Sequence, residues 1–284
     1  MNIFFKRASW SLLATALLPL WCSSAFASGA WIARHGMTAS SYQNNFNTIV
    51  GNGYRLTDVS GYTVNGQPRF AALWNQSSSA QSPWVAHHNM TSAQYQQKFD
   101  QYVSQGYQLI DVSGYEVNGT DRYAAFWQKR DPNTVWQARH GMSAAQYQQT
   151  FNQLVGQGYR LVHINGYSIG GNSRFAAIWI KGGGTPWQAR HGMSAAQYQQ
   201  TFNQLVSQGY RLTDVTGYEE NGQARYAAIW IKSGSFPWQA RHGMSAAQYQ
   251  QTFDQLVGQG YRLTHVDGYT VNGQDRYAAI WWKI

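Results

Sequence analysis

Trp136–Val155 reads W-Q-A-R-H-G-M-S-A-A-Q-Y-Q-Q-T-F-N-Q-L-V, and the phrase recurs almost unchanged from Trp187 and Trp238. Looser copies begin at Trp31 and Trp84, so the five tryptophans are spaced by 53, 52, 51 and 51 residues. A fixed period of this size indicates tandem copies of one supersecondary unit, and each copy needs its neighbours to complete a core. A single catalytic centre is poorly served by five equivalent units. Repetition favours a repeated binding site or a repeated contact between units.

The phrase predicts a strand followed by a helix. Trp136–Met142 alternates as a short strand. Ser143 and Gln146 have the spacing of a capping box, in which a Ser hydroxyl and a Gln amide satisfy free N–H groups at a helix start. Thr38 lacks the partner glutamine, since Ser41 stands in its place. An apolar stripe then follows at helical spacing. It consists of Tyr147, Phe151, Leu154 and Val155.

A hairpin is predicted to complete each unit. Gly158 stands where a left-handed helix cap is wanted, and Tyr159–Ile169 and Arg174–Ile180 have the composition of strands. Between them most repeats carry Asn-Gly, the strongest short signal for a hairpin, and repeat three carries Gly170-Gly171. Each repeat is therefore expected to be a β-α-β-β unit. The Asn-Gly pairs stand at 65–66, 118–119, 221–222 and 272–273.

These units predict an α/β repeat protein. Closure into a five-fold, propeller-like ring is favoured because repeat five closely matches its interior neighbours, whereas an open solenoid normally ends in a polar cap. The open solenoid is the alternative. The expected divisions are a leader at 1–27 and repeats at 28–76, 84–129, 136–181, 187–232 and 238–284.

The first 27 residues resemble a secretory signal peptide. Lys6 and Arg7 precede an apolar stretch too short to span a bilayer, and Ala25-Phe26-Ala27 has the pattern of a cleavage site. Cleavage would remove Cys22, the single cysteine, so no disulfide framework is expected. The expected location is secreted or periplasmic, with no transmembrane anchor after cleavage.

The charge points to anionic partners without defining one. Loss of Lys6 and Arg7 lowers the formal charge from +9 to +7, and basic proteins attract acidic polymers. Only 12 % of the residues are charged, and the cations are scattered through the repeats with no run of Lys or Arg. The expected partner is an extracellular polymer or glycan, with anionic ones included, and not a specific nucleic acid. We expect no cofactor.

The whole repeated region resembles a known bacterial tandem repeat. W-x-A-R-H-G-M, G-Y-R-L, N-G and R-[FY]-A-A-[IL]-W are similar to the structural repeats of polyglycine hydrolases, although repeat two has His87-His88-Asn89 in place of Arg-His-Gly. In those enzymes the repeats accompany a β-lactamase-like catalytic domain with an S-x-x-K motif. No lysine here has a serine three positions before it. The resemblance therefore implies an accessory, binding or scaffolding array.

The recurring Arg-His pairs are the main candidate site. One interpretation is a small pocket per repeat, in which a guanidinium fork and an imidazole face sugar hydroxyls or a carboxylate. In the other interpretation, which is favoured, the histidine packs inward at the joint between repeats. The candidate ligand-binding residues are Arg34, His35, His88, Arg139, His140, Arg190, His191, Arg241 and His242.

Three further signals are given structural interpretations. No sequence-local ligand spacing supports a metal site. His163 and His265 replace an aspartate found in the other repeats, which suggests an exposed, tolerant position without an acid–base partner. Ser168 lies in a G-x-S-x-G match, but on a predicted hairpin strand, so no catalytic residue is assigned.

Aromatic residues of the hairpins are expected to be mainly core, with about two buried for each exposed. They are Trp74, Trp127, Trp179, Trp230 and Trp281, with Tyr62, Tyr115, Tyr167, Tyr218 and Tyr269.

The leading functional hypothesis is a secreted, non-enzymatic repeat protein that binds a repetitive extracellular ligand. A cell-surface or cell-wall glycan is the first candidate, because several weak sites can combine through avidity. The alternative is a hydrolase, or the accessory part of one, acting on cell-wall or peptide substrate. A third hypothesis is a structural surface protein without a ligand.

Overall fold

The computed structural model describes residues 29–76, 82–234 and 236–283. The predicted leader, 1–27, lies outside the described residues. Within them, no helix has both the length and the apolar character needed to cross a membrane.

Each repeat folds as the predicted strand, helix and hairpin, and each forms its own three-stranded antiparallel sheet. The first strands are β1 (Trp31–Thr38), β4 (Trp84–Thr91), β7 (Trp136–Met142), β10 (Trp187–Met193) and β13 (Trp238–Met244). The helices are α1 (Ala39–Gly51), α2 (Ser92–Ser104), α3 (Ala144–Gly156), α4 (Ala195–Ser207) and α5 (Ala246–Gly258).

The hairpin supplies the other two strands of each sheet. The second strands are β2 (Tyr54–Val64), β5 (Tyr107–Val117), β8 (Tyr159–Ile169), β11 (Tyr210–Glu220) and β14 (Tyr261–Val271). The third strands are β3 (Gln67–Gln76), β6 (Thr120–Lys129), β9 (Asn172–Lys181), β12 (Gln223–Lys232) and β15 (Gln274–Lys283). In unit one the order across the sheet is β1-β3-β2, and the other units repeat it. The second strand is therefore an edge strand in every unit.

Local sequence signals determine the ends of the helices and the turns. Helices α2 to α5 begin with complete capping boxes, whereas at α1 only Thr38 accepts a hydrogen bond, from the Ser41 N–H. The asparagines of the Asn-Gly turns have φ angles of 50 to 52°, which suit two-residue hairpins. These predictions are confirmed.

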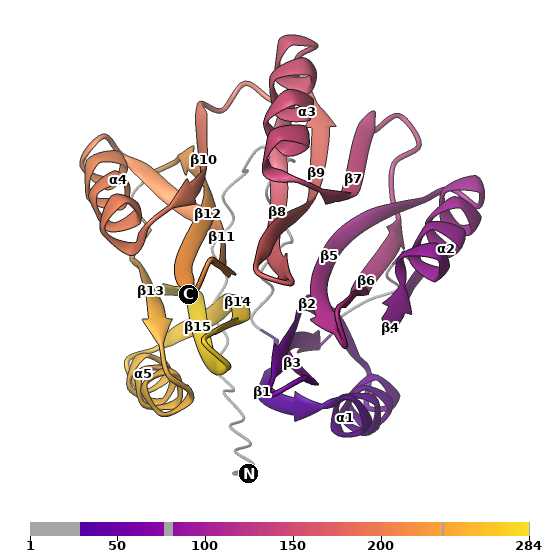
Figure 1. Ribbon diagram of the computed structural model, residues 1–284, viewed down its shortest axis with the longest axis horizontal. Helices are drawn as coiled ribbons and strands as arrows, with labels where there is room; N and C mark the ends of the chain where they lie inside the picture. The colour runs from indigo at the N-terminus through magenta and orange to yellow at the C-terminus, as the bar shows by residue number, and fades with distance from the viewer. Residues whose placement is uncertain (1–28, 77–81, 235, 284) are drawn as a thin grey trace.

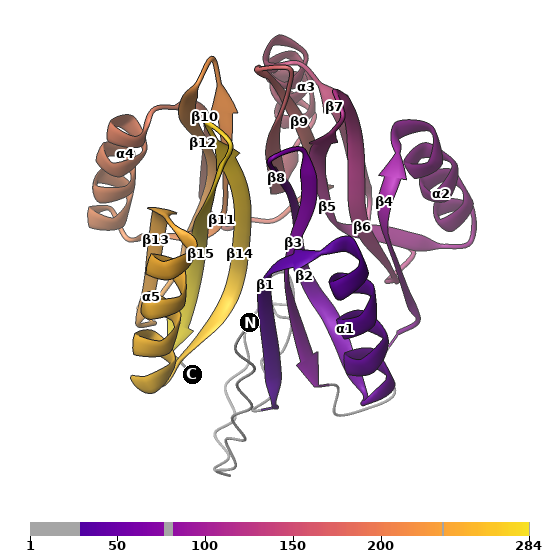
Figure 2. The same ribbon diagram turned by 60° about the horizontal axis from the view of Figure 1, so that its bottom comes forward.

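The five units are arranged around one centre (Figure 1). The second strands lie innermost, and the helices lie on the outside of the sheets (Figure 2). Inner strand β14 of unit five contacts β2 of unit one, as β2 contacts β5. The described residues thus place unit five beside unit one, a contact that an open solenoid would lack. The five sheets remain separate and are joined through side chains.

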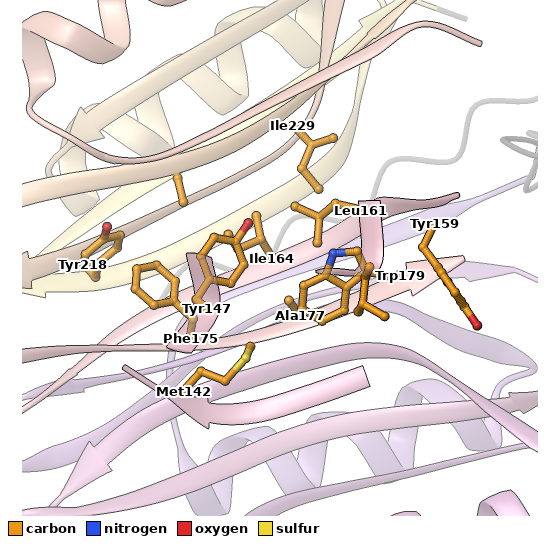
Figure 3. Close-up of a cluster of buried hydrophobic side chains, with 12 residues drawn as sticks. Met142, Tyr147, Tyr159, Leu161, Ile164, Phe175, Ala177, Trp179, Tyr218 and Ile229 are labelled. Carbon is orange, nitrogen blue, oxygen red and sulfur yellow. The ribbon is translucent and has the colours of Figure 1, made fainter. Parts of the chain in front are cut away.

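Hydrophobic cores are shared between neighbouring units. Figure 3 shows one of them, in which Trp179 and Phe175 of unit three pack with Tyr218 and Ile229 of unit four. An equivalent cluster combines Trp281 of unit five with residues of unit one. No unit therefore buries its own apolar surface alone, as expected for a repeat protein.

The hairpin aromatics are more buried than predicted. All five hairpin tryptophans have an exposed fraction of 0 %, and the five hairpin tyrosines have 2 to 5 %. The expectation of one exposed residue for every two buried was wrong. Sheets covered by a helix on one side and by the next unit on the other leave these positions no access to solvent.

Each joint between units contains a glycine covered by a tyrosine ring from the next unit. A Cβ atom built on any of these glycines would come to 2.4 Å from the ring. Real Cβ atoms do not approach so closely, so only glycine fits without movement. The pairs are Gly61 with Tyr115, Gly114 with Tyr167, Gly166 with Tyr218, Gly217 with Tyr269, and Gly268 with Tyr62.

Gly166→Ala should test the importance of this contact. The new methyl group overlaps the Tyr218 ring inside a packed core, so we expect a loss of about 1–3 kcal/mol in the free energy of unfolding. Gly156→Ala is the matched control, because that helical glycine has no neighbour within 4 Å of an added Cβ. Denaturant unfolding of both variants gives the comparison. Equal stability of the two would contradict the proposed tight joint.

Candidate functional site

Two grooves lie on the outer rim of the molecule, each between the helix of one unit and the first strand of the next. The larger groove, about 480 Å³, lies between α4 and β13. A second, about 280 Å³, lies between α3 and β10. Both are lined by Tyr, Gln and Phe from the helix and by Ala, Arg and His from the strand.

Aromatic contacts fix the two walls of each groove. Trp238 packs edge-on against Phe202 of the preceding helix, with the ring centroids 5.5 Å apart. Trp187 meets Phe151 in the same way at 5.8 Å. Trp31 of unit one packs on Phe253 of unit five at 5.6 Å. The tryptophan that opens each of these repeats therefore packs against the helix of the preceding unit and forms an outer contact between the two units.

The rim histidines form part of this joint. His242 lies edge-on to Tyr198 at 4.6 Å and to Tyr226 at 5.0 Å, both from the preceding unit. His191 contacts Tyr147 similarly, and its Nε2 lies 2.8 Å from Gln148 Oε1. His35, His88 and His140 make the equivalent pairs of ring contacts.

Burial lowers the pKa of all five rim histidines. The pKa of His35 falls to about 4, although Asp275 opposes the shift. These side chains are therefore neutral at pH 7 and suited to packing and hydrogen bonding.

In three of the pairs the arginine is more exposed than the histidine. Arg139, Arg190 and Arg241 are exposed, and each donates a hydrogen bond from Nη1 to the carbonyl of the preceding alanine at 2.7 Å. Arg34 is half-buried and makes the same bond at 2.8 Å. The two members of each pair thus make different contacts: the histidines pack on rings of the preceding unit, whereas the arginines bond only to their own strand. Arg190 and Arg241 line the two grooves beside His191 and His242.

Repeat two keeps the backbone of the phrase with different side chains. Asn89 has φ 56°, close to the 64 to 68° of the glycines at this position in other units. Asparagine tolerates this left-handed conformation. The Asn89 N–H donates to Tyr115 Oη at 3.0 Å, as the Gly192 N–H does to Tyr218. His87 replaces the arginine and contacts Tyr102 Oη at 2.7 Å.

The prediction for His163 and His265 was wrong. Both lie on inner strands at the centre of the molecule, and their side chains are only 14 % exposed. They also have the carboxylate partners that the sequence did not reveal. Together with the aspartates at the same position of the other units they form what we call the central belt. Its members are Asp58, Asp111, His163, Asp214 and His265.

The belt explains how aspartate and histidine replace each other. Inner strands are edge strands, and each belt side chain hydrogen-bonds the free backbone of the preceding unit. Asp214 accepts from the Ile164 N–H at 2.9 Å, whereas His265 Nε2 lies 2.8 Å from the Val215 carbonyl oxygen. Aspartate satisfies a backbone donor and histidine a backbone acceptor on equivalent strand edges of successive units. The position is buried and specific.

Contacts within the belt determine its charges. His163 Nδ1 lies 3.0 Å from Asp214 and Nε2 3.3 Å from Asp111. Burial alone would lower the pKa of His163, but these two carboxylates raise it to about 10. Asp214 also faces His265 at 3.4 Å, and the two imidazoliums hold its pKa below the ordinary value despite burial.

Asp111 differs from Asp214. Burial raises its pKa to about 7, because His163 opposes the rise only in part and the carboxylate of Asp58 adds to it. The belt is thus a buried polar network within which the carboxylates have unequal affinities for protons.

Ser168 lies on strand β8, and its Oγ donates to the Glu219 carbonyl of the next unit. A nucleophile elbow requires a strand–turn–helix context, which this strand does not provide. Within the described ranges, no group of three or more His, Cys, Asp or Glu side chains is arranged to hold a metal ion.

His163→Gln should reveal the belt through pH dependence. Removing one partner from a buried ion pair costs roughly 3–5 kcal/mol, so we expect a loss of this size near pH 7. Because the pKa of His163 is about 10 in the folded state and 6.5 ordinarily, its stabilising effect is complete below pH 6.5. The difference from the parent should shrink as the pH rises towards 10.

His242→Gln is the control for this prediction. The pKa of His242 is lowered by burial, so the parent should lose stability at this site as the pH falls below 6.5. Denaturant unfolding of parent and variants at several pH values measures both trends. A common pH dependence for the two variants would contradict the opposite pKa shifts.

Comparison with known proteins places the repeats in one family. The model of the polyglycine hydrolase-like structural repeat matches residues 28–77, 81–130, 133–182, 184–233 and 236–284. A search of curated proteins gave no significant match. The matches cover nearly all of the chain after the predicted leader, and they confirm the resemblance seen in the sequence. The chain belongs to the polyglycine hydrolase-like structural-repeat family.

Proposed function

We propose that this is a secreted, non-enzymatic protein that binds a repetitive extracellular glycan through its rim grooves. The observation that carries the proposal is the recurrence of one kind of groove, with aromatic, guanidinium and amide groups side by side. Aromatic faces suit the apolar faces of sugar rings, while arginine and glutamine can hydrogen-bond hydroxyl or carboxylate groups.

Groove geometry supports multivalent binding. The hollows recur at the same place in successive units, so a polymer with repeated sugars can occupy more than one. A second contact on the same polymer is intramolecular, and avidity can raise the overall affinity by factors of about 10²–10⁴. Weak individual sites are therefore sufficient. Export, proposed from the leader pattern at 1–27, would place the protein beside such polymers.

The triple variant Arg139→Ala, Arg190→Ala, Arg241→Ala tests this function. These side chains are exposed, so each change should alter stability by less than about 0.5 kcal/mol. Retention on peptidoglycan and on immobilised cell-surface glycan should fall steeply, because avidity multiplies the individual losses. Thermal unfolding and pull-down of the mature protein provide the measurements.

A matched control removes the same charge elsewhere. Arg122, Arg174 and Arg276 stand beside hairpin turns, away from the grooves, and their replacement by alanine should leave retention unchanged. Equal loss in both triple variants would point to net charge alone. Unchanged binding by a stable rim variant would reject the rim grooves as the site.

A further inference from the structure

The two ends of the units form two different faces. At one end of each unit the first and second strands begin and the third strand ends. In unit five, for example, Trp238 pairs with Trp282 and Tyr261 pairs with Lys283 at this end. The connectors between units leave from this end, which we call the connector face. The hairpin turns lie at the opposite end, which we call the turn face.

Positive charge is concentrated on the connector face. Nine cations stand at the strand ends or in the connectors there, and Asp131 is the one acidic residue at these positions in the part of the chain that the structure describes. The cations are Arg55, Lys129, Arg130, Arg160, Lys181, Arg211, Lys232, Arg262 and Lys283.

The turn face is balanced by comparison. It carries five arginines and five carboxylates, and Arg225 forms an ion pair with Glu220 at 3.2 Å. The charge of the chain is therefore segregated and not spread evenly. The residues are Arg69, Arg122, Arg174, Arg225 and Arg276, with Glu116, Asp121, Glu219, Glu220 and Asp275.

The lysines of the connector face are placed to contact a partner. All four are exposed, and each ammonium group lies over a tyrosine ring of its own unit at 5.5 to 5.8 Å. The arginines behind them are 6 to 8 % exposed except for Arg130, so they add to the field without reaching outward. Five helix C-termini also end here, but each contributes only about half a negative charge.

Exposed apolar side chains share this face. Val135 is 51 % exposed and Phe236 is 53 % exposed, more than any other large hydrophobic residue that the structure describes. Both lie in connectors. The Val135 carbonyl accepts from the Lys181 N–H at 2.8 Å, and Pro237, next to Phe236, accepts from Lys283 at 2.8 Å. Two exposed apolar side chains thus share one end of the molecule with the cations.

We propose that the connector face docks on the surface of an anionic lipid bilayer. Four separated lysines, one from each of units two to five, match several phosphates presented in one plane, and each basic residue near such a surface contributes about 1 kcal/mol, or about fivefold in affinity. Phe236 and Val135 reach the boundary between headgroups and acyl chains. This surface is distinct from the rim grooves, so the inference stands independently of the proposed glycan binding.

Vesicle flotation tests the proposal with the mature protein. It should float with vesicles of phosphatidylcholine containing about 30 % phosphatidylglycerol, but not with phosphatidylcholine alone, and salt should weaken the binding. Changing Lys129, Lys181, Lys232 and Lys283 to glutamine should lower the partition coefficient at least about a hundredfold. Phe236→Ser should cause a smaller loss that persists at high salt, since its contribution is apolar.

The control changes Arg69, Arg122, Arg174 and Arg276 of the turn face to glutamine, removing the same charge. It should float almost like the parent, and thermal unfolding should show that both quadruple variants are folded. Three results would overturn the proposal: equal loss in the control, no flotation of the parent, or capture by soluble polyphosphate without binding to vesicles. The rim triple variant should still float, which separates this inference from the proposed function.

Discussion

The structure depends on how five edge strands satisfy their free backbone groups. An unpaired strand edge is costly when buried, and the usual solution is another strand. Here the next unit supplies side chains. The glycine of each Gly-Tyr pair also donates its N–H to a polar side chain of the next unit, which stands two residues after the belt residue of that unit. Gly61 donates in this way to Ser113 and Gly268 to Ser60, both at 2.9 Å.

This solution couples the units while leaving each sheet separate. Because a side chain on one unit satisfies the backbone of its neighbour, the register between units is fixed by sequence at three adjacent features. These are the belt residue, the polar residue after it, and the Gly-Tyr pair. The contact from unit five to unit one uses the same features, with Asp58 accepting from Val266 and Tyr62 covering Gly268.

Sequence alone predicted what is local within a repeat. Capping boxes, Asn-Gly turns and most of the apolar helix stripe act within a few residues and appear as expected, but Val155 of the stripe is 37 % exposed. The central belt was missed because its contacts join residues about 50 positions apart, and period-two alternation does not identify an edge that a neighbouring unit covers. The sequence did carry one signal for the belt. Aspartate and histidine replace each other at the position of residue 163 in the five repeats, and in every repeat a polar residue follows two positions later and Gly-Tyr begins three positions later.

At the candidate sites, too, some side chains act within their own repeat and others contact the neighbouring unit. The Arg-His pair looked like one feature because its members are adjacent, but the strand shifts its register directly after the arginine, and the two side chains make different contacts. Histidine contacts rings of the preceding unit, so losing it should disturb two units, whereas the exposed arginine bonds only to its own strand and its replacement should change stability little. The lysines of the connector face are also free of the joints. Side chains that contact the neighbouring unit are therefore constrained, and binding surfaces on this fold can vary only at positions whose side chains make no such contact.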